Sequence, residues 1–284
     1  FSACSAIECM LPTLARDSPS SRCGRHGKMV GMNLDLNGRV YLVTGGTRGL
    51  GWATAQALVA EGASVVVSSR DEQAVQKAAT QLGAADVAVG LVADNADPNA
   101  AERLTAAAVA RFGRLDGALI SVGGPPAGAA STVSDADWRH AFESVFLGGV
   151  RIARAVAGAV GDGGSIAFVL STSVRSPIEG LAISNGLRPG LAMVAKAMAD
   201  ELGPRGVRVN GLLPGRISTD RVRELDAASG NADLAQARHS ERIPLRRYGS
   251  PDEFGRVAAF VLSPAASYLT GAMIPVDGGA TRSL

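Results

Sequence analysis

The stretch TGGTRGLG, residues 44–51, places four glycines between an apolar run and an amphipathic segment. The apolar run RVYLVTG (39–45) predicts a buried strand, and LGWATAQALVAEG (50–62) predicts a helix that ends at its glycine. In this position Gly45, Gly49 and Gly51 let the backbone approach a pyrophosphate resting on the helix N-terminus. A tight turn without a ligand is the alternative, and the strand-to-helix context favours the phosphate loop.

Strand-like and helix-like segments alternate along the rest of the chain. Apolar runs predict strands at 39–45, 64–69, 86–94, 115–123, 165–173, 206–215 and 271–279. Amphipathic stretches predict helices at 50–62, 71–82, 98–113, 135–160, 181–202 and 251–263. We therefore expect an α/β fold, a single doubly wound (Rossmann) parallel sheet flanked by helices on both faces. Residues 216–250 show the least regular pattern and predict a lid over the site.

Composition excludes several classes of protein. The 284 residues are 46% hydrophobic and 19% charged, which is ordinary for a globular chain with a sizeable core. No apolar run approaches the roughly 20 residues of a membrane span. A net charge of +2 without a basic stripe argues against nucleic-acid binding. We expect a cytoplasmic protein with neither nucleic-acid nor membrane partners.

The start of the chain differs from the rest. Residues 1–31 are largely polar and lack apolar periodicity, so we expect a disordered or non-native extension, with a functional tail as the alternative. The folded domain is expected at 32–284. All three cysteines, Cys4, Cys9 and Cys23, fall in the extension with spacings that match no usual zinc pattern, so no metal site is expected.

Five further parts of the chain, taken together with the glycine loop, match the sequence pattern of one protein family. They are VAD (92–94), SVGG (121–124), Ser171 after the fifth strand, VRVNGLLPGRIST (207–219) and YLTGAMIPVDGG (268–279). With TG-x-x-x-G-x-G they resemble the short-chain dehydrogenase/reductase (SDR) family from about Leu36 to the C-terminus. The resemblance implies an oxidoreductase that interconverts a small-molecule carbonyl and alcohol with a nicotinamide dinucleotide. It also implies a homotetramer or homodimer.

The resemblance further implies which residues contact the dinucleotide. Asp94 is expected at the adenine, and the segment after Pro214 along the nicotinamide. The full expected set is Gly45, Thr47, Arg48, Gly49, Leu50, Gly51, Ser69, Arg70, Asp94, Gly123, Pro214, Gly215, Ile217 and Thr219.

The end of the second strand indicates which dinucleotide binds. An acidic residue there would hold the ribose 2′-hydroxyl of NAD, but Ser69 occupies that place and Arg70 follows it. Arg70 and Arg48 can clamp a 2′-phosphate, so NADP(H) is favoured over NAD(H). The alternative is that both arginines are solvated loop charges. Asp71 is an objection, although its position predicts the start of the next helix.

The segment LAISNGLRPGLAMVAKAMADEL (181–202) departs from the SDR pattern, which has a Tyr and a Lys four residues apart. Ser184 and Arg188 stand at those positions, and Val145 stands at the position of a supporting Asn. Ser171 lies 13 residues before Ser184, the family distance between the catalytic Ser and Tyr. The pattern SNxxR resembles a divergent SDR subgroup labelled 3-oxoacyl-carrier-protein reductase-like.

Two other residues near these positions are weaker candidates. Ser173 could substitute as a hydroxyl, but we interpret it as a strand-end turn residue. Lys196 lies two turns beyond Arg188 and is a lesser candidate for a cofactor contact.

The replacements predict a modified mechanism. A serine hydroxyl is a weaker acid than the Tyr phenol, and arginine remains charged. We expect Ser171 and Ser184 to orient the carbonyl, Arg188 to supply positive charge, and water or substrate to supply the proton. A capping role for Ser184 and Asn185 is the alternative. Because proline disfavours helical geometry before it, Pro189 predicts a kink or a late helix start.

Two functions remain open from the residues alone. The leading expectation is an NADP-dependent SDR oxidoreductase. The alternative is a non-catalytic NADP(H)-binding sensor or scaffold, which the missing Tyr and Lys favour and which Ser171 and the glycine loop oppose.

Overall fold

The computed structural model describes residues 33–228 and 230–283. Within these ranges seven parallel strands form one sheet in the order β3-β2-β1-β4-β5-β6-β7. They are β1 (Val40–Thr44), β2 (Ser64–Ser69), β3 (Ala88–Val92), β4 (Gly117–Ile120), β5 (Ser165–Val169), β6 (Arg208–Pro214) and β7 (Met273–Val276). The strand order reverses direction between β1 and β4, which defines a doubly wound sheet. The expected fold class is confirmed.

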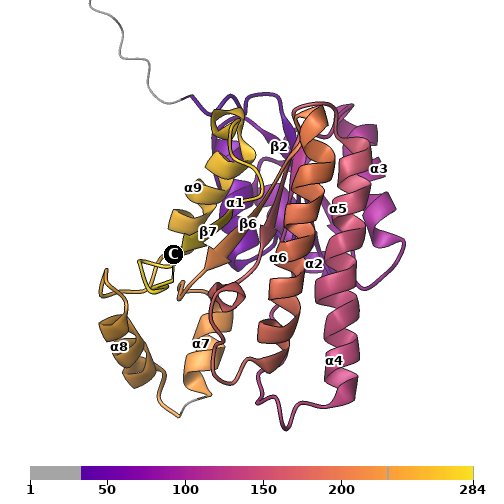
Figure 1. Ribbon diagram of the computed structural model, residues 1–284. Helices are drawn as coiled ribbons and strands as arrows, with labels where there is room; N and C mark the ends of the chain where they lie inside the picture. The colour runs from indigo at the N-terminus through magenta and orange to yellow at the C-terminus, as the bar shows by residue number, and fades with distance from the viewer. Residues whose placement is uncertain (1–32, 229, 284) are drawn as a thin grey trace, which may run out of the picture. The chain divides into compact units, whose positions relative to one another are not determined.

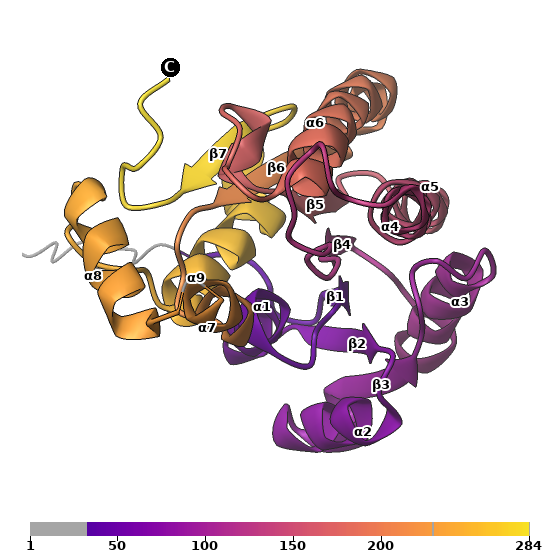
Figure 2. The ribbon, with the colours of Figure 1, turned by 90° about the horizontal axis from the view of Figure 1, so that it is seen from below.

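Helices cover both faces of this sheet (Figures 1 and 2). In the described ranges they are α1 (Gly49–Ala60), α2 (Glu72–Gln81), α3 (Ala100–Phe112), α4 (Asp135–Ala141), α5 (Gly148–Ala159), α6 (Ala182–Leu202), α7 (Asp220–Ala227), α8 (Ala232–Arg242) and α9 (Pro251–Leu262). A π-helix, η2 (Phe142–Leu147), joins α4 to α5, and a short 3₁₀ turn, η3 (Thr172–Val174), follows β5. Strands buried on both faces explain why the strand segments read as unbroken apolar runs.

Two apolar layers hold the helices to the sheet. One layer joins α3, α5 and α6 to the face that carries Leu42 and Phe168. The other joins α1, α2 and α9 to the face that carries Tyr41 and Val43. Burial of one Leu or Phe side chain contributes about 1.5–3 kcal/mol, so these layers fix the ends of the strands and the loops that follow them.

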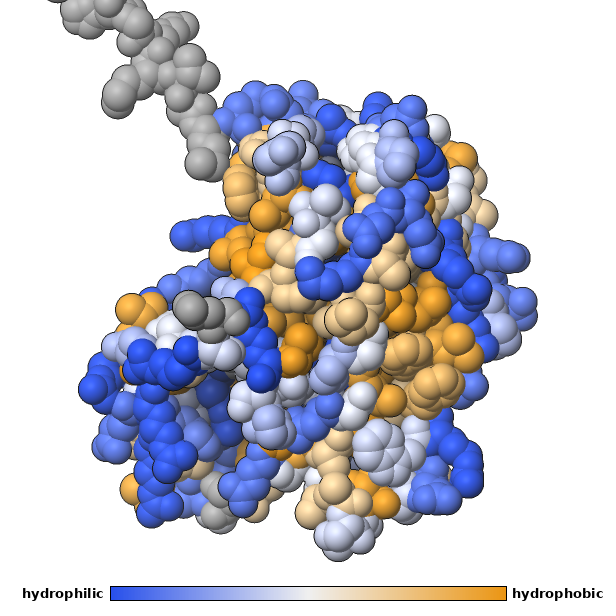
Figure 3. Space-filling model, viewed as in Figure 1, coloured by the Kyte–Doolittle hydropathy of each residue, from blue (hydrophilic) through white to orange (hydrophobic). Residues whose placement is uncertain are grey.

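The segment 216–250 is more regular than its sequence suggested. It contains α7 and α8, so the expectation of an irregular segment is wrong. Both helices bury little apolar surface, since Asp226 is the buried residue of α7 and Ala235 that of α8. Figure 3 shows the polar surface over α8.

None of the described helices is both long enough and apolar enough to cross a membrane. The extension expected at residues 1–31 and its cysteines lie outside the described residues.

Candidate active site

The carboxyl ends of β1, β4, β5 and β6 deliver the expected site residues to one edge of the sheet. In Figure 1, α7, α8 and the first turns of α4 and α6 lie at this lower edge. Thr44 ties the ends of β1 and β4 together, because its Oγ1 donates to the Ser121 carbonyl at 2.7 Å and accepts from the Ser121 amide at 2.9 Å. Ligand sites in open parallel sheets lie at such an edge, where the strand order reverses.

The glycine loop curls tightly against the start of α1. Gly45 has a φ of 59°, in the left-handed region that favours glycine. A Cβ on Gly51 would lie 2.3 Å from the Gly45 carbonyl oxygen, so no larger residue fits there without moving the loop. No side chain caps the start of α1, and its first turn carries no acidic residue. Uncapped amides and the positive end of the helix dipole fit a phosphate at this position.

The segment after β6 lies beside the glycine loop. The Thr219 methyl carbon is 3.5 Å from the place that a Cβ on Gly49 would take. Thr219 also begins α7, because its side chain accepts from the Val222 amide. Pro214 ends β6, Gly215 bonds the Val276 carbonyl, and Ile217 forms a β-bridge with Gly249. The remaining expected contacts are Thr47 in the glycine loop, Leu50 in the first turn of α1 and Gly123 after β4.

Two exposed arginines lie in the loops that follow β1 and β2. Neither Arg48 nor Arg70 has an ion-pair or side-chain hydrogen-bond partner among the described residues. The Asp71 carboxylate caps α2 by accepting from the Ala74 amide at 3.0 Å, so it begins the helix as its position predicted. Ser69 bonds the Asp71 backbone, and the Asp94 carboxylate accepts from the Ala96 amide at 3.0 Å. Both guanidinium groups are therefore exposed and unpaired within the described part of the chain.

Three serines come together after β5. The Ser171 Oγ accepts the Ser173 amide at 3.1 Å, and the Ser173 and Ser184 hydroxyls lie 3.3 Å apart. Ser173 is 4% exposed and Ser184 is 6% exposed. One bond between two hydroxyls uses one hydrogen, so this pair keeps one O–H to donate. Ser173 lies in the 3₁₀ turn that follows β5, as its interpretation as a strand-end turn residue predicts, and its hydroxyl also reaches Ser184.

Arg188 lies buried next to this cluster. Its Nη1 donates to the carbonyls of Val169 at 2.7 Å and Leu170 at 2.9 Å, the last residues before Ser171. Burial lowers the pKa of Arg188 to about 10, so the guanidinium remains charged at neutral pH. No carboxylate pairs with it among the described residues. The side chain therefore places an uncompensated positive charge below the carboxyl end of β5.

Helix α6 begins before both replacement residues. It runs as an α-helix from Ala182 through Pro189 to Leu202, so the expected late start is wrong. Its N-cap, Leu181, receives no side-chain cap. Asn185 instead accepts from the Ile178 amide at 3.0 Å and donates to the Ile178 carbonyl at 2.8 Å. The capping alternative for Ser184 and Asn185 is therefore also wrong.

The loop after β4 is attached to the start of α6. The Gly128 amide donates to the Gly180 carbonyl at 2.7 Å, and the Ala182 amide donates to the Gly128 carbonyl at 3.1 Å. These bonds form a β-bridge between Gly128 and Leu181. The two loops on the substrate side of the edge are thus joined to each other.

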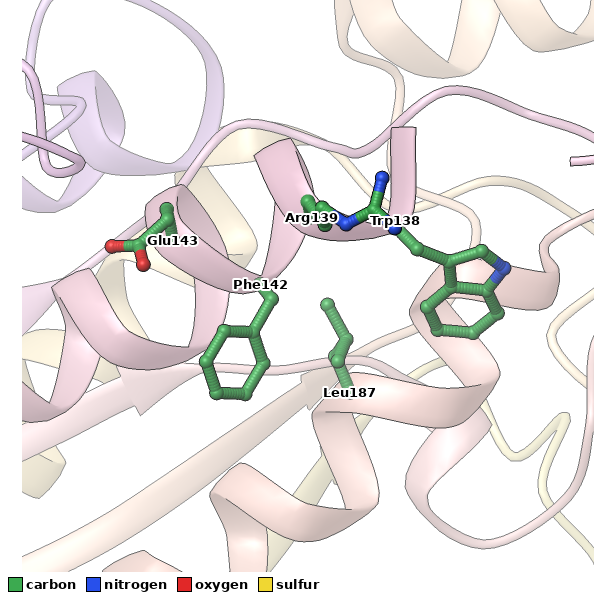
Figure 4. A pocket seen from close by; sticks show the side chains of 5 residues that line it. All are labelled: Trp138, Arg139, Phe142, Glu143 and Leu187. Carbon is green, nitrogen blue, oxygen red and sulfur yellow. The ribbon is translucent and has the colours of Figure 1, made fainter. Parts of the chain in front are cut away.

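An apolar wall stands beside Ser184. Val145, in the π-helix, is 3% exposed and packs with Ile183 in a cluster that includes Trp138 and Leu187. The family resemblance implied a polar Asn at this position, and the chain has the apolar side chain of Val145 there. Trp138 and Leu187 also line an open hollow of about 410 Å³ with Arg139, Phe142 and Glu143 (Figure 4).

Lys196 and the three tyrosines do not contact the serine cluster. Lys196, the lesser candidate for a cofactor contact, donates to the Gly271 carbonyl at 2.9 Å, just ahead of β7 and at the opposite edge of the sheet. Tyr41 donates to the Leu262 carbonyl, Tyr248 donates to Asp226, and Tyr268 is fully exposed. No phenol contacts the serine cluster among the described residues.

A polar network ties α7 and α8 to the segment ahead of α9. Asp226 bonds Arg216 at 2.5 Å and accepts from the Tyr248 hydroxyl at 3.0 Å. His239 contacts Arg216 through Nε2 and Tyr248 through Nδ1, each at 3.1 Å. Because arginine only donates, Nε2 must accept, and the imidazole is neutral in this arrangement. Burial and the Arg216 charge accordingly lower the pKa of His239.

Comparison with known proteins gives consistent matches. The family model described as enoyl-(acyl carrier protein) reductase matches residues 45–281. Cyclohexanol dehydrogenase of Rhodococcus is 33% identical over 278 residues, with 88% of this chain and 99% of the relative covered. A short-chain dehydrogenase/reductase of Brucella melitensis aligns with a TM-score of 0.83 at 29% identity, covering 89% of this chain and 100% of the other.

A further solved structure shows a ligand state. L-sorbose reductase of Gluconobacter frateurii, in complex with NADPH and L-sorbose, aligns with a TM-score of 0.84 at 26% identity. It covers 89% of this chain and 100% of the other.

In the described part of this chain, no group of His, Cys, Asp and Glu is arranged to hold a metal ion.

Proposed function

Because the chain belongs to the short-chain dehydrogenase/reductase family, we propose that it is an NADP(H)-dependent oxidoreductase that interconverts a small carbonyl compound and its alcohol. One observation carries the cofactor preference: an uncapped α1 N-terminus faces a tight glycine loop, with two unpaired arginines beside it. The similar L-sorbose reductase was solved in complex with NADPH, which supports the same cofactor.

The cofactor would be held by the edge described above. The glycine loop and the first amides of α1 would bind the pyrophosphate, and Arg48 and Arg70 the 2′-phosphate. Asp94 is assigned to the adenine end, and the segment from Pro214 to Thr219 to the nicotinamide end. When bound, NADPH supplies the hydride.

The chain's own residues orient and polarise the carbonyl. Ser171 uses its oxygen as an acceptor for the Ser173 amide, which leaves its hydrogen to donate. The Ser173–Ser184 pair supplies a second O–H. The Arg188 charge lies behind both donors and favours negative charge on the carbonyl oxygen. Since no phenol lies in this cluster, the proton comes from water or from the substrate.

The wall beside Ser184 bears on the substrate. Val145, Ile183 and Trp138 offer no hydrogen bonds at the reacting end except the indole N–H. We propose that the substrate presents an apolar flank to this wall. The name of the Rhodococcus relative, cyclohexanol dehydrogenase, agrees with an apolar alcohol.

The rival function is a non-catalytic NADP(H) sensor, and the missing phenol favours it. Calorimetry with NADPH and NADH tests the cofactor first. We expect Arg48→Ala and Arg70→Ala each to weaken NADPH binding by about tenfold, the value of roughly 1.4 kcal/mol, and to leave NADH binding unchanged. NADPH oxidation against cyclic ketones, linear ketones and acyl thioesters then separates the two functions. Tight binding without turnover would favour the sensor, and failure to bind either dinucleotide would refute both.

Assembly and location complete the proposal. Met193 on α6 is 66% exposed and Phe142 is 43% exposed, and Figure 3 shows apolar residues over the middle of α6. These side chains support the association of α4–η2 and α6 with a second copy, as a homodimer or homotetramer in the cytoplasm. Light scattering after size exclusion tests the assembly: Met193→Asp and Phe142→Asp should yield monomer, and a monomeric wild type would contradict it.

A further inference from the structure

Arg221 links two parts of the site that are far apart in sequence. It lies in the first turn of α7, and its Nη2 donates to the Pro125 carbonyl at 2.7 Å. Its side chain passes over Gly124, where a Cβ would lie 2.8 Å from the Arg221 Nε. In this position the guanidinium occupies space that a side chain at position 124 would take, so a larger residue there would displace it.

Both ends of this link belong to the active-site edge. The α7 end follows Thr219, whose methyl carbon lies 3.5 Å from the place that a Cβ on Gly49 of the glycine loop would take. The Pro125 end belongs to the loop that Gly128 joins to the start of α6. The Arg221–Pro125 bond therefore connects α7, which follows the segment beside the glycine loop, with the loop that is bonded to the start of α6.

The link is weak enough to open. It consists of one bond to a neutral carbonyl, and the Arg221 side chain is 38% exposed. Its other near contact is Glu224 of the same helix, at 3.7 Å. A partly exposed bond of this kind shifts an equilibrium by about tenfold, or roughly 1.4 kcal/mol.

We propose that Arg221 is a positioning residue, whose bond to Pro125 fastens the 216–250 segment over the bound substrate. The lack of a side chain at Gly124 leaves room for the Arg221 guanidinium. This inference rests on the proposed carbonyl–alcohol activity. Closure of this kind holds the substrate in place and excludes water, as lids do in other enzymes. Arg221 itself touches none of the reacting atoms.

Hydrogen exchange provides a test that does not depend on turnover. In Arg221→Gln, the amides of α7 should exchange about tenfold faster, which corresponds to roughly 1.4 kcal/mol of lost closure. Arg223→Gln is the matched control, because Arg223 lies on the same helix, is exposed, and among the described residues pairs with Asp220 alone. The control should exchange like the wild type. Equal exchange in all three proteins would overturn the proposal.

Kinetics and a second variant separate closure from plain stability. Without the Arg221–Pro125 bond, substrate binding itself must supply the free energy that closes α7 over the site. The substrate KM of Arg221→Gln should therefore rise by up to about tenfold, while kcat stays within about twofold. Gly124→Ala should reproduce this effect by displacing the flexible guanidinium, and the double variant should be no worse than either single one. Additive effects, or a lower melting temperature with an unchanged KM, would overturn the inference. If no carbonyl compound of the panel is reduced, the proposed function fails. The hydrogen-exchange comparison then still shows whether Arg221 holds α7 closed.

Discussion

Replacing Arg188 by methionine should separate stability from catalysis. The buried guanidinium has a pKa lowered to about 10 by desolvation, which costs its charged form about 3 kcal/mol in the folded state. Methionine removes that cost, but it leaves the Val169 and Leu170 carbonyls without a donor, at about 1–3 kcal/mol each. These terms oppose each other, so the free energy of unfolding should fall by no more than about 3 kcal/mol.

Catalysis should respond much more strongly to the same change. If the Arg188 charge stabilises the developing alkoxide, its loss should lower kcat by about 100-fold or more. The assays are urea unfolding and NADPH oxidation with the best ketone of the panel. NADPH affinity should change by less than about threefold, since the bonded nitrogen of Arg188 faces the β5 carbonyls.

Arg208 offers a matched control at the other end of the sheet. It is also a buried arginine that bonds only backbone carbonyls, those of Val261, Leu262, Ser263 and Leu269. Arg208→Met should destabilise the fold by about 3 kcal/mol or more and leave kcat of the folded protein unchanged. The reasoning fails if Arg188→Met keeps its kcat, or if it unfolds as readily as the control.

Three further predictions follow from the geometry. Gly51→Ala should abolish dinucleotide binding in calorimetry while the protein stays folded, because its Cβ would lie 2.3 Å from the Gly45 carbonyl; binding at wild-type strength would contradict the loop assignment. The pKa of His239 is lowered in the fold, so the unfolded chain takes up its proton first; stability should fall as pH drops below the ordinary value of about 6.5, and less so in His239→Gln. Asn185→Ala should lose two bonds to Ile178 and about 1–2 kcal/mol of stability; an unchanged urea midpoint would show that the loop holds without them.

The fold was predictable because the sheet is covered on both sides. Most interior strands are short apolar runs, and the glycine loop marks the first strand-to-helix turn, so the fold class follows from the sequence. The segment 216–250 was not predictable in the same way. Its helices lack an apolar stripe and are held by contacts among Arg216, Asp226, His239 and Tyr248. No spacing rule shows that these four side chains meet.

The site was predictable in its parts but not in its contacts. The positions of Ser184 and Arg188 follow from counting, and both lie buried on α6 as a shared face requires. Their partners do not follow from counting, because Ser173 reaches Ser184 only through the 3₁₀ turn after β5. Pro189 misled the prediction of a late start, since the helix tolerates the lost amide while Asn185 bonds the preceding loop.

The bridge between Gly128 and Leu181 has a consequence for protein engineering. The loop after β4 lies at the site edge, so it is a natural choice for a loop exchange meant to change the substrate range. Here that loop shares backbone hydrogen bonds with the residues that start α6. A graft of residues 123–131 alone would bring new side chains and also shift the first turn of α6, which carries Ser184. The transplantable unit is therefore the pair of loops, moved together with the first turn of the helix.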